Sequence, residues 1–214
     1  MTLISKNALN ITALCALVNI TWVLLLPDNL ISINAFKDNG TVSHINMALI
    51  LAGAAYTLWL GLSSFAGRTL DWFCVTFIFQ IYLLREANFH ESFSSLSLTQ
   101  WKSYTYPDIP LTLKLVAAMA LLLLFMSISY LLARYIAGIT RALTRGSAWA
   151  IAVAIWAVAI IVSQFIDRKI AVEGAHWKWS GVEEMIELGA AVFALLALIQ
   201  FVHHYQHKYK DYFS

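Results

Sequence analysis

Six stretches of this sequence are long and apolar enough to cross a lipid bilayer as α-helices, and this pattern limits the fold more than any other feature. A membrane-spanning helix needs about 20 mostly apolar residues, because the hydrocarbon core of a bilayer is about 30 Å thick. The stretches cover residues 10–26, 44–65, 72–90, 110–135, 147–166 and 182–203. We therefore expect an all-α fold, a polytopic membrane protein that forms a bundle of about six transmembrane helices.

The composition supports the same class of protein. Hydrophobic residues make up 60% of the chain and charged residues only 12%, whereas a soluble domain carries roughly 25% charged residues on its hydrated surface. The net charge is +2, and the sequence contains no basic run or aromatic motif typical of nucleic-acid binding. Membrane lipids are the expected surroundings, and no nucleic-acid partner is expected.

The chain is expected to form one integral-membrane helical domain over residues 1–214. Most connections between the apolar stretches are short, and the two longer ones cover residues 29–43 and 92–109. No fixed-period repeat or low-complexity linker separates parts of the chain. The stretch at 72–90 is the weakest span, because its uninterrupted apolar part ends at Leu84 and is followed by Arg85 and Glu86.

The orientation depends on lysine and arginine near the helix ends, since cytoplasmic loops of membrane proteins carry an excess of these residues. Counted over all ends, the two sides carry seven each. The loop after the fourth stretch concentrates Arg134, Arg141 and Arg145 without an acidic residue. This loop favours an orientation with both termini in the cytoplasm. We expect the membrane to be a bacterial inner membrane.

With this orientation, ionisable residues gather at the outer ends of the third, fifth and sixth stretches. The members that carry the argument are Glu86, His90, Asp167, Glu183, Glu184 and Glu187. Residues four apart lie on one face of a helix, which pairs Glu86 with His90 and Glu183 with Glu187. The inner side holds only two acids, Asp71 and Asp211.

Glu187 is the most informative of these residues, because residues 188–201 after it contain no charge. We expect its carboxylate to lie inside the hydrocarbon, where an ionised group costs about 2.5–3.5 kcal/mol on insertion scales. Such a group needs a partner, a cation or a wet cavity. Glu184 lies nearer the predicted helix start, where headgroup water and the helix dipole should support its charge.

One imidazole and several carboxylates are ligands that Zn²⁺, Mn²⁺ or Fe²⁺ accept. The pattern predicts a divalent metal site with the ligands Glu86, His90, Asp167 and Glu187. The predicted catalytic residues are Glu183, Glu187 and Asp167, which would hold or activate water as a base.

These residues favour an integral-membrane enzyme, a hydrolase or transferase that acts on a lipid or lipid-linked substrate at the outer membrane face. One alternative is a proton- or cation-coupled transporter or channel that uses the same carboxylates as a relay. Another is a non-catalytic assembly subunit, in which Arg85 and Arg168 would neutralise the acids in a structural ion-pair network. The middle of the fourth and fifth stretches has few polar residues, which favours a one-sided site.

Overall fold

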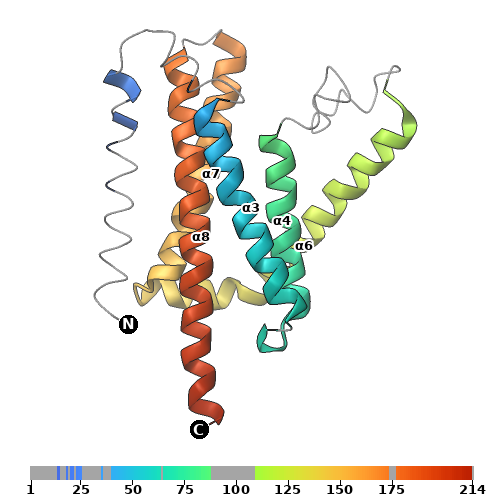
Figure 1. The fold of residues 1–214 in the computed structure, drawn as a ribbon, viewed down its shortest axis with the longest axis vertical. Helices are drawn as coiled ribbons and strands as arrows, with labels where there is room; N and C mark the ends of the chain where they lie inside the picture. The colour runs from blue at the N-terminus through green and yellow to red at the C-terminus, as the bar shows by residue number, and fades with distance from the viewer. Residues whose placement is uncertain are drawn as a thin grey trace. The chain divides into compact units, whose positions relative to one another are not determined.

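The computed structural model describes residues 40–63, 65–87, 109–173 and 177–213, together with residues 14, 18, 20, 21, 23–25 and 35; the side chains of 66, 167–173 and 206–213 are not described. These residues contain helices and no strand (Figure 1). The helices are α3 (Thr41–Leu62), α4 (Thr69–Glu86), α6 (Leu111–Thr144), α7 (Ala148–Glu173) and α8 (Trp177–Phe213), with a 3-10 turn, η1 (Phe65–Gly67), after α3.

Four helical segments are long and apolar enough to cross a membrane, judged by length and composition: Thr41–Leu62, Leu111–Thr144, Ala148–Ile166 and Trp177–Tyr205. They coincide with four of the six predicted spans, so the chain is an all-α integral membrane protein. The predicted span at 72–90 corresponds to α4, which is helical but carries the charged residues Asp71, Arg85 and Glu86 among 18 positions. The predicted span at 10–26 lies largely outside the described residues.

The chain divides into two compact units, one formed by Met1–Leu49 with Gly138–Ser214 and the other by Ile50–Ala137. The boundaries of the units fall inside α3 and α6. Each unit is described below by itself. The single domain over residues 1–214 stays a prediction.

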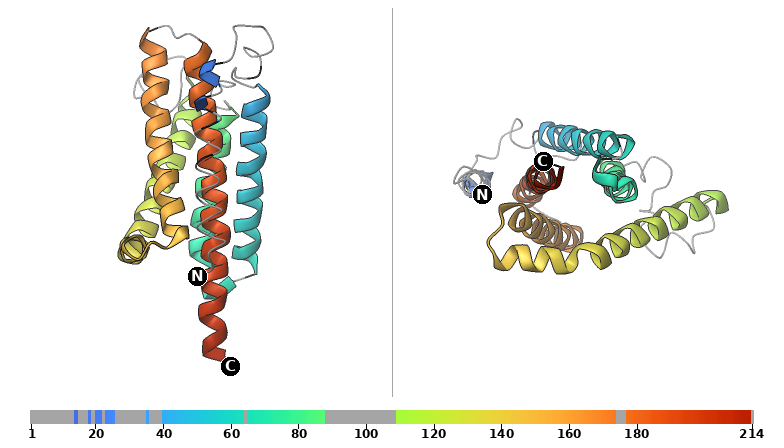
Figure 2. Two further views of the ribbon diagram at one scale, coloured as in Figure 1. Left: turned by 90° about the vertical axis from the view of Figure 1, so that its left-hand side faces the viewer. Right: turned by 90° about the horizontal axis from the view of Figure 1, so that it is seen from below.

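In the first unit, α7 and α8 pack side by side (Figures 1 and 2). The chain enters α7 through a tight turn at the end of α6. Gly146 has a φ of 66°, a left-handed conformation that costs glycine little. Its N–H donates to the Leu143 carbonyl, and the N–H of Ser147 donates to the Ala142 carbonyl, each at 2.9 Å. This pair of bonds is a Schellman motif, which ends α6 and lets α7 begin at Ala148.

Two apolar clusters lie among the described residues of the first unit. The Phe193 cluster has the buried residues Ala152, Phe193 and Ala197, with Ile151, Val153, Ile155, Trp156 and Leu196 packed against them. The Val182 cluster has the buried residues Val23 and Val182, with Ile20, Ala35, Val42, Ile166, Trp177, Met185 and Ile186 around them. The Val182 cluster draws its α8 residues from the first turns of that helix, and the Phe193 cluster from further along it.

In the second unit, α3 and α4 form a helical hairpin with small residues along the contact. Gly53, Thr57 and Gly61 recur every four positions on α3, a spacing that lets membrane helices approach closely. A Cβ placed on Gly53 would lie 2.5 Å from Cε1 of Phe79 on α4. One turn further, the hydroxyl of Thr76 donates to that of Thr57 at 2.9 Å. The hairpin turn at η1 thus brings α3 and α4 into an antiparallel pair (Figure 1).

Candidate functional site

Glu187 lies within the segment of α8 that is long and apolar enough to cross a membrane, and it contacts Ser163 on α7. The Ser163 hydroxyl donates a hydrogen bond of 2.5 Å to Oε1 of Glu187. Ser163 is 0% exposed and Glu187 is 5% exposed. The Glu187 side chain is therefore buried and has a hydroxyl partner, and its depth in the hydrocarbon stays a prediction.

The Ser163–Glu187 pair lies between the two apolar clusters along α7 and α8. Ile166, Val182 and Met185 belong to the Val182 cluster, on the side where α8 begins. Phe193 and Ala197 belong to the Phe193 cluster, further along α8. A carboxylate in such a low-dielectric environment interacts with a neighbouring proton or cation more strongly than it would in water. The pair is therefore suited to holding or moving a proton.

Glu183 and Glu184 lie deeper than the sequence indicates. Helix α8 begins at Trp177, five residues before the predicted start at residue 182, so its first turn contains no acid. Glu184 is only 8% exposed, and Glu183, one turn from Glu187 on the same face, is partly buried. The expectation that Glu184 lies at the helix start in contact with headgroup water is wrong, because residues 177–181 extend the helix beyond it.

The structure describes only some of the remaining predicted site residues. Glu86 lies in the last turn of α4 in the second unit and is 8% exposed. Its Oε1 is 3.9 Å from Nη1 of Arg85, which agrees with the ion pair considered for these neighbours. His90 lies outside the described residues, and Asp167 lies in α7 with its side chain outside the description. The convergence of Glu86, His90 and Asp167 on Glu187 stays a prediction.

A divalent metal also stays a prediction. Among the described side chains, no group of three or more His, Cys, Asp or Glu residues is placed to hold a metal ion. Two of the four predicted ligands, His90 and Asp167, have side chains outside the described part of the chain.

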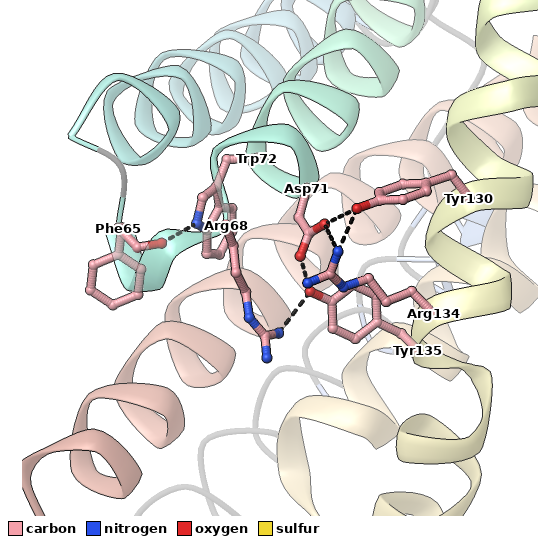
Figure 3. Close-up of polar contacts among 7 residues, drawn as sticks. All are labelled: Phe65, Arg68, Asp71, Trp72, Tyr130, Arg134 and Tyr135. Carbon is pink, nitrogen blue, oxygen red and sulfur yellow. Dashed lines mark hydrogen bonds and ion pairs between the residues drawn. The ribbon is translucent and has the colours of Figure 1, made fainter. Parts of the chain in front are cut away.

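The second unit contains a polar cluster that the sequence reasoning missed. This Asp71 cluster consists of Arg68, Asp71, Tyr130, Arg134 and Tyr135 (Figure 3). Asp71 lies in the first turn of α4 and is 4% exposed. The hydroxyl of Tyr130 donates to its Oδ1 at 2.7 Å, and the hydroxyl of Tyr135 donates to its Oδ2. Both carboxylate oxygens of Asp71 are therefore bound by α6.

The two arginines complete the Asp71 cluster. Nη1 of Arg134 lies 3.3 Å from Oδ1 of Asp71 and donates to the Tyr130 hydroxyl at 2.6 Å. Nη1 of Arg68 donates to the Tyr135 hydroxyl at 2.7 Å, and the Arg68 guanidinium lies over the Tyr135 ring, 5.5 Å from its centroid. The hairpin turn before α4 is itself held by Trp72, whose Nε1 donates to the Phe65 carbonyl at 3.2 Å (Figure 3).

One signal in the sequence points to the Asp71 cluster. Asp71 is one of only two acids assigned to the side of the membrane where arginines concentrate, and Tyr130 and Arg134 are four residues apart on one helical face. A single carboxylate near several arginines, at the start of an apolar helix, predicts a specific ion pair or hydrogen bond to that carboxylate. The sequence does not indicate that α6 supplies that partner, since the contact joins residues about 60 positions apart.

Comparison with known proteins identifies no matching family model, no curated relative and no similar solved structure.

Proposed function

We propose that the chain is a membrane-embedded hydrolase or transferase in which Glu187 is the general base and Ser163 is the nucleophile. The full chain would form a six-span bundle in a bacterial inner membrane, with both termini in the cytoplasm. The observation that carries the proposal is the 2.5 Å hydrogen bond from Ser163 to Glu187. A nucleophile and its base within hydrogen-bond reach are the recurring feature of covalent catalysis by hydroxyl groups.

The chemistry is an acyl or phosphoryl transfer. Glu187 accepts the proton of the Ser163 hydroxyl as the Ser163 oxygen forms a bond to the carbonyl carbon or phosphorus of the substrate. The bond from that carbon or phosphorus to the leaving group breaks, and the leaving group takes the proton from Glu187. Water in a hydrolase, or an acceptor hydroxyl in a transferase, then gives a proton to Glu187 and attacks the ester formed on Ser163, and the Ser163 oxygen takes the proton back from Glu187 as it leaves. Glu183, one turn away on the same face of α8, and Asp167 on α7 are the further residues proposed to assist proton transfer.

The surroundings of the pair favour a lipid or lipid-linked substrate. Val182, Ile166 and Met185 lie between the pair and the start of α8, so a substrate that enters from this end meets apolar side chains. Because Ser163 is 0% exposed, entry requires a local rearrangement of the side chains that cover it. An acyl chain can replace these apolar contacts, whereas a small hydrophilic substrate would have to leave water without compensation.

The same geometry favours an enzyme over a transporter. A relay across the membrane requires polar groups on both sides of Glu187. Beyond the pair, toward the C-terminal end of α8, lies the Phe193 cluster. It consists of alanine, isoleucine, leucine, valine and aromatic side chains. A one-sided pocket is sufficient for an enzyme.

Covalent labelling of Ser163 tests this proposal. The purified full-length chain, in detergent and in phospholipid nanodiscs, is incubated with an alkyl fluorophosphonate, which reacts with activated serine nucleophiles. Peptide mass spectrometry then locates the adduct. We expect the adduct on Ser163 in the wild-type protein and its complete loss in Ser163→Ala.

Ser147→Ala provides the matched control, because Ser147 lies just before α7 and outside the proposed site. This variant should label as the wild type does. Absence of an adduct on Ser163 in folded wild-type protein, in both detergent and nanodiscs, contradicts the proposed nucleophile.

A further inference from the structure

The Asp71 cluster carries more positive than negative charge. It contains the guanidinium groups of Arg68 and Arg134 and the single carboxylate of Asp71, and neutral tyrosines supply its other polar groups. With the arginines and the aspartate ionised, the cluster has a net charge of +1. Asp71 is almost fully buried, so the excess positive charge lies on the outer part of the cluster, with the arginines.

The length of α6 puts the cluster at the membrane–water interface when residues 111–129 cross the bilayer. Residues 111–129 of α6 contain only one charged residue, Lys114, and they span about 28 Å along the helix axis, close to the thickness of the hydrocarbon core. Tyr130, Arg134 and Tyr135 follow directly. Tyrosine and arginine are typical of the membrane–water interface. Asp71 lies in the first turn of α4, directly after the hairpin turn of the same unit.

Arg134 retains binding capacity in this position. Both of its contacts within the cluster are made by Nη1, whereas a guanidinium has five N–H donors. Its side chain is 45% exposed. Arg134 reaches the cluster from α6, and Arg68 reaches it from the turn before α4 (Figure 3). Tyr130 and Tyr135 connect both guanidinium groups to the Asp71 carboxylate, which fixes their positions.

We propose that Arg68 and Arg134 bind the phosphate group of an anionic phospholipid at this membrane interface. Arginine is well suited to phosphate, because its planar donors pair with two oxygens of one anion. The source is a lipid headgroup rather than free phosphate, because the cluster lies at headgroup depth, beside the apolar surface of α6. Leu122, Phe125 and Met126 on that helix are exposed in the chain and would lie against the acyl chains.

Asp71, Tyr130 and Tyr135 are positioning residues in this site. Without Asp71, the two arginines would lose the shared anchor that orients them. The carboxylate also limits the net charge to +1, which matches one phosphodiester. The site is independent of the Ser163–Glu187 pair, so the two proposals stand or fall separately.

Native mass spectrometry of the purified full-length protein tests this inference. The probes are dioleoylphosphatidylglycerol, which is anionic, and dioleoylphosphatidylethanolamine, which is zwitterionic, added at equal concentration. We expect the wild type to retain phosphatidylglycerol preferentially. The double variant Arg68→Gln with Arg134→Gln should bind it about tenfold or more weakly, as expected from the loss of charge-assisted hydrogen bonds.

Arg85→Gln is the matched control, because it removes an arginine from the opposite end of α4 and should leave the preference intact. If the double variant fails to fold, Arg134→Gln alone supplies the test, since its exposed side chain can be replaced with little effect on packing. Equal retention of the two lipids by the wild type, or unchanged phosphatidylglycerol binding in folded Arg134→Gln, overturns the inference. Displacement of the lipid by millimolar inorganic phosphate overturns the assignment to a lipid headgroup.

Discussion

The Ser163 hydroxyl oxygen lies 2.5 Å from Oε1 of Glu187, and both residues are buried between helices that are long and apolar enough to cross a membrane. A buried carboxylate is costly in an apolar environment unless polar groups stabilise it. The Ser163 hydroxyl donates a hydrogen bond that offsets part of this cost. It also places an oxygen nucleophile directly beside a base. This relationship is the basis of the enzymatic proposal and of the first prediction.

Ser163→Ala should destabilise the first unit. The substitution removes a buried hydrogen bond to Glu187, and a bond of this kind contributes about 0.5–1.5 kcal/mol. Thermal unfolding of the purified protein in detergent, followed by circular dichroism, measures the effect. The wild type provides the baseline. A Ser163→Ala protein as stable as the wild type would show that the hydrogen bond contributes nothing to the fold.

Gly53→Ala should destabilise the α3–α4 hairpin. The new Cβ would lie 2.5 Å from the Phe79 ring, and overpacking of this kind costs about 1–3 kcal/mol. Gly138→Ala on α6 is the matched control, because a Cβ at that position would have nothing within 4 Å and alanine favours a helix by about 1 kcal/mol. Unfolding measurements should separate the two, and Phe79→Leu should partly rescue Gly53→Ala. Equal stability of both alanine variants contradicts the close approach.

Asp71→Asn should weaken the contact between α4 and α6 more than Tyr130→Phe does. The asparagine loses the charge that pairs with Arg134 and that strengthens two hydrogen bonds from tyrosine. The phenylalanine loses only one hydroxyl donor, a change of about 1 kcal/mol. The free energy of unfolding of the two variants provides the comparison. A larger effect from Tyr130→Phe would mean that Asp71 is not the centre of the cluster.

Both termini should lie in the cytoplasm, and residues 92–109 should lie on the opposite side. The last turns of α6 and the turn after it carry Arg134, Arg141 and Arg145, and this concentration motivates the orientation, since arginines near the ends of membrane helices are in excess on the cytoplasmic side. Reporter fusions after Ser214 and within residues 92–109 measure it, with alkaline phosphatase active outside and green fluorescent protein fluorescent inside. Phosphatase activity at the Ser214 fusion contradicts the orientation.

The sequence predicts those parts of the fold that depend on the length of apolar runs. The segments at 44–65, 110–135, 147–166 and 182–203 need only enough consecutive apolar residues, and each coincides with a helix able to span a membrane. The burial of Glu187 follows from the same reasoning, because the uncharged residues 188–201 after it extend the apolar segment in which it lies. Helix boundaries are harder to predict, and the start of α8 at Trp177 buries Glu184 against expectation.

The partners of buried side chains could not be predicted in the same way. Periodicity indicates which residues share a face of one helix, but it does not say which helix meets that face. The spacing of four residues puts Ser163 on the same face of α7 as Asp167, but it does not indicate that Ser163 contacts Glu187 on α8. Asp71 is recognised as an isolated acid without any indication that Tyr130 and Tyr135 bind it. These contacts depend on tertiary packing.

The rate at which the alkyl fluorophosphonate labels Ser163 in Glu187→Gln tests the central claim most directly. A general base contributes typically about 10²–10⁴-fold, so the account predicts a fall of about 100-fold or more, while circular dichroism shows that the variant is folded. Glu184→Gln, which alters another buried acid on the same helix, should label within about twofold of the wild type when its rate is normalised to the folded fraction. Equal labelling rates in wild type, Glu187→Gln and Glu184→Gln, at equal folded fraction, would contradict the role of Glu187 as the base.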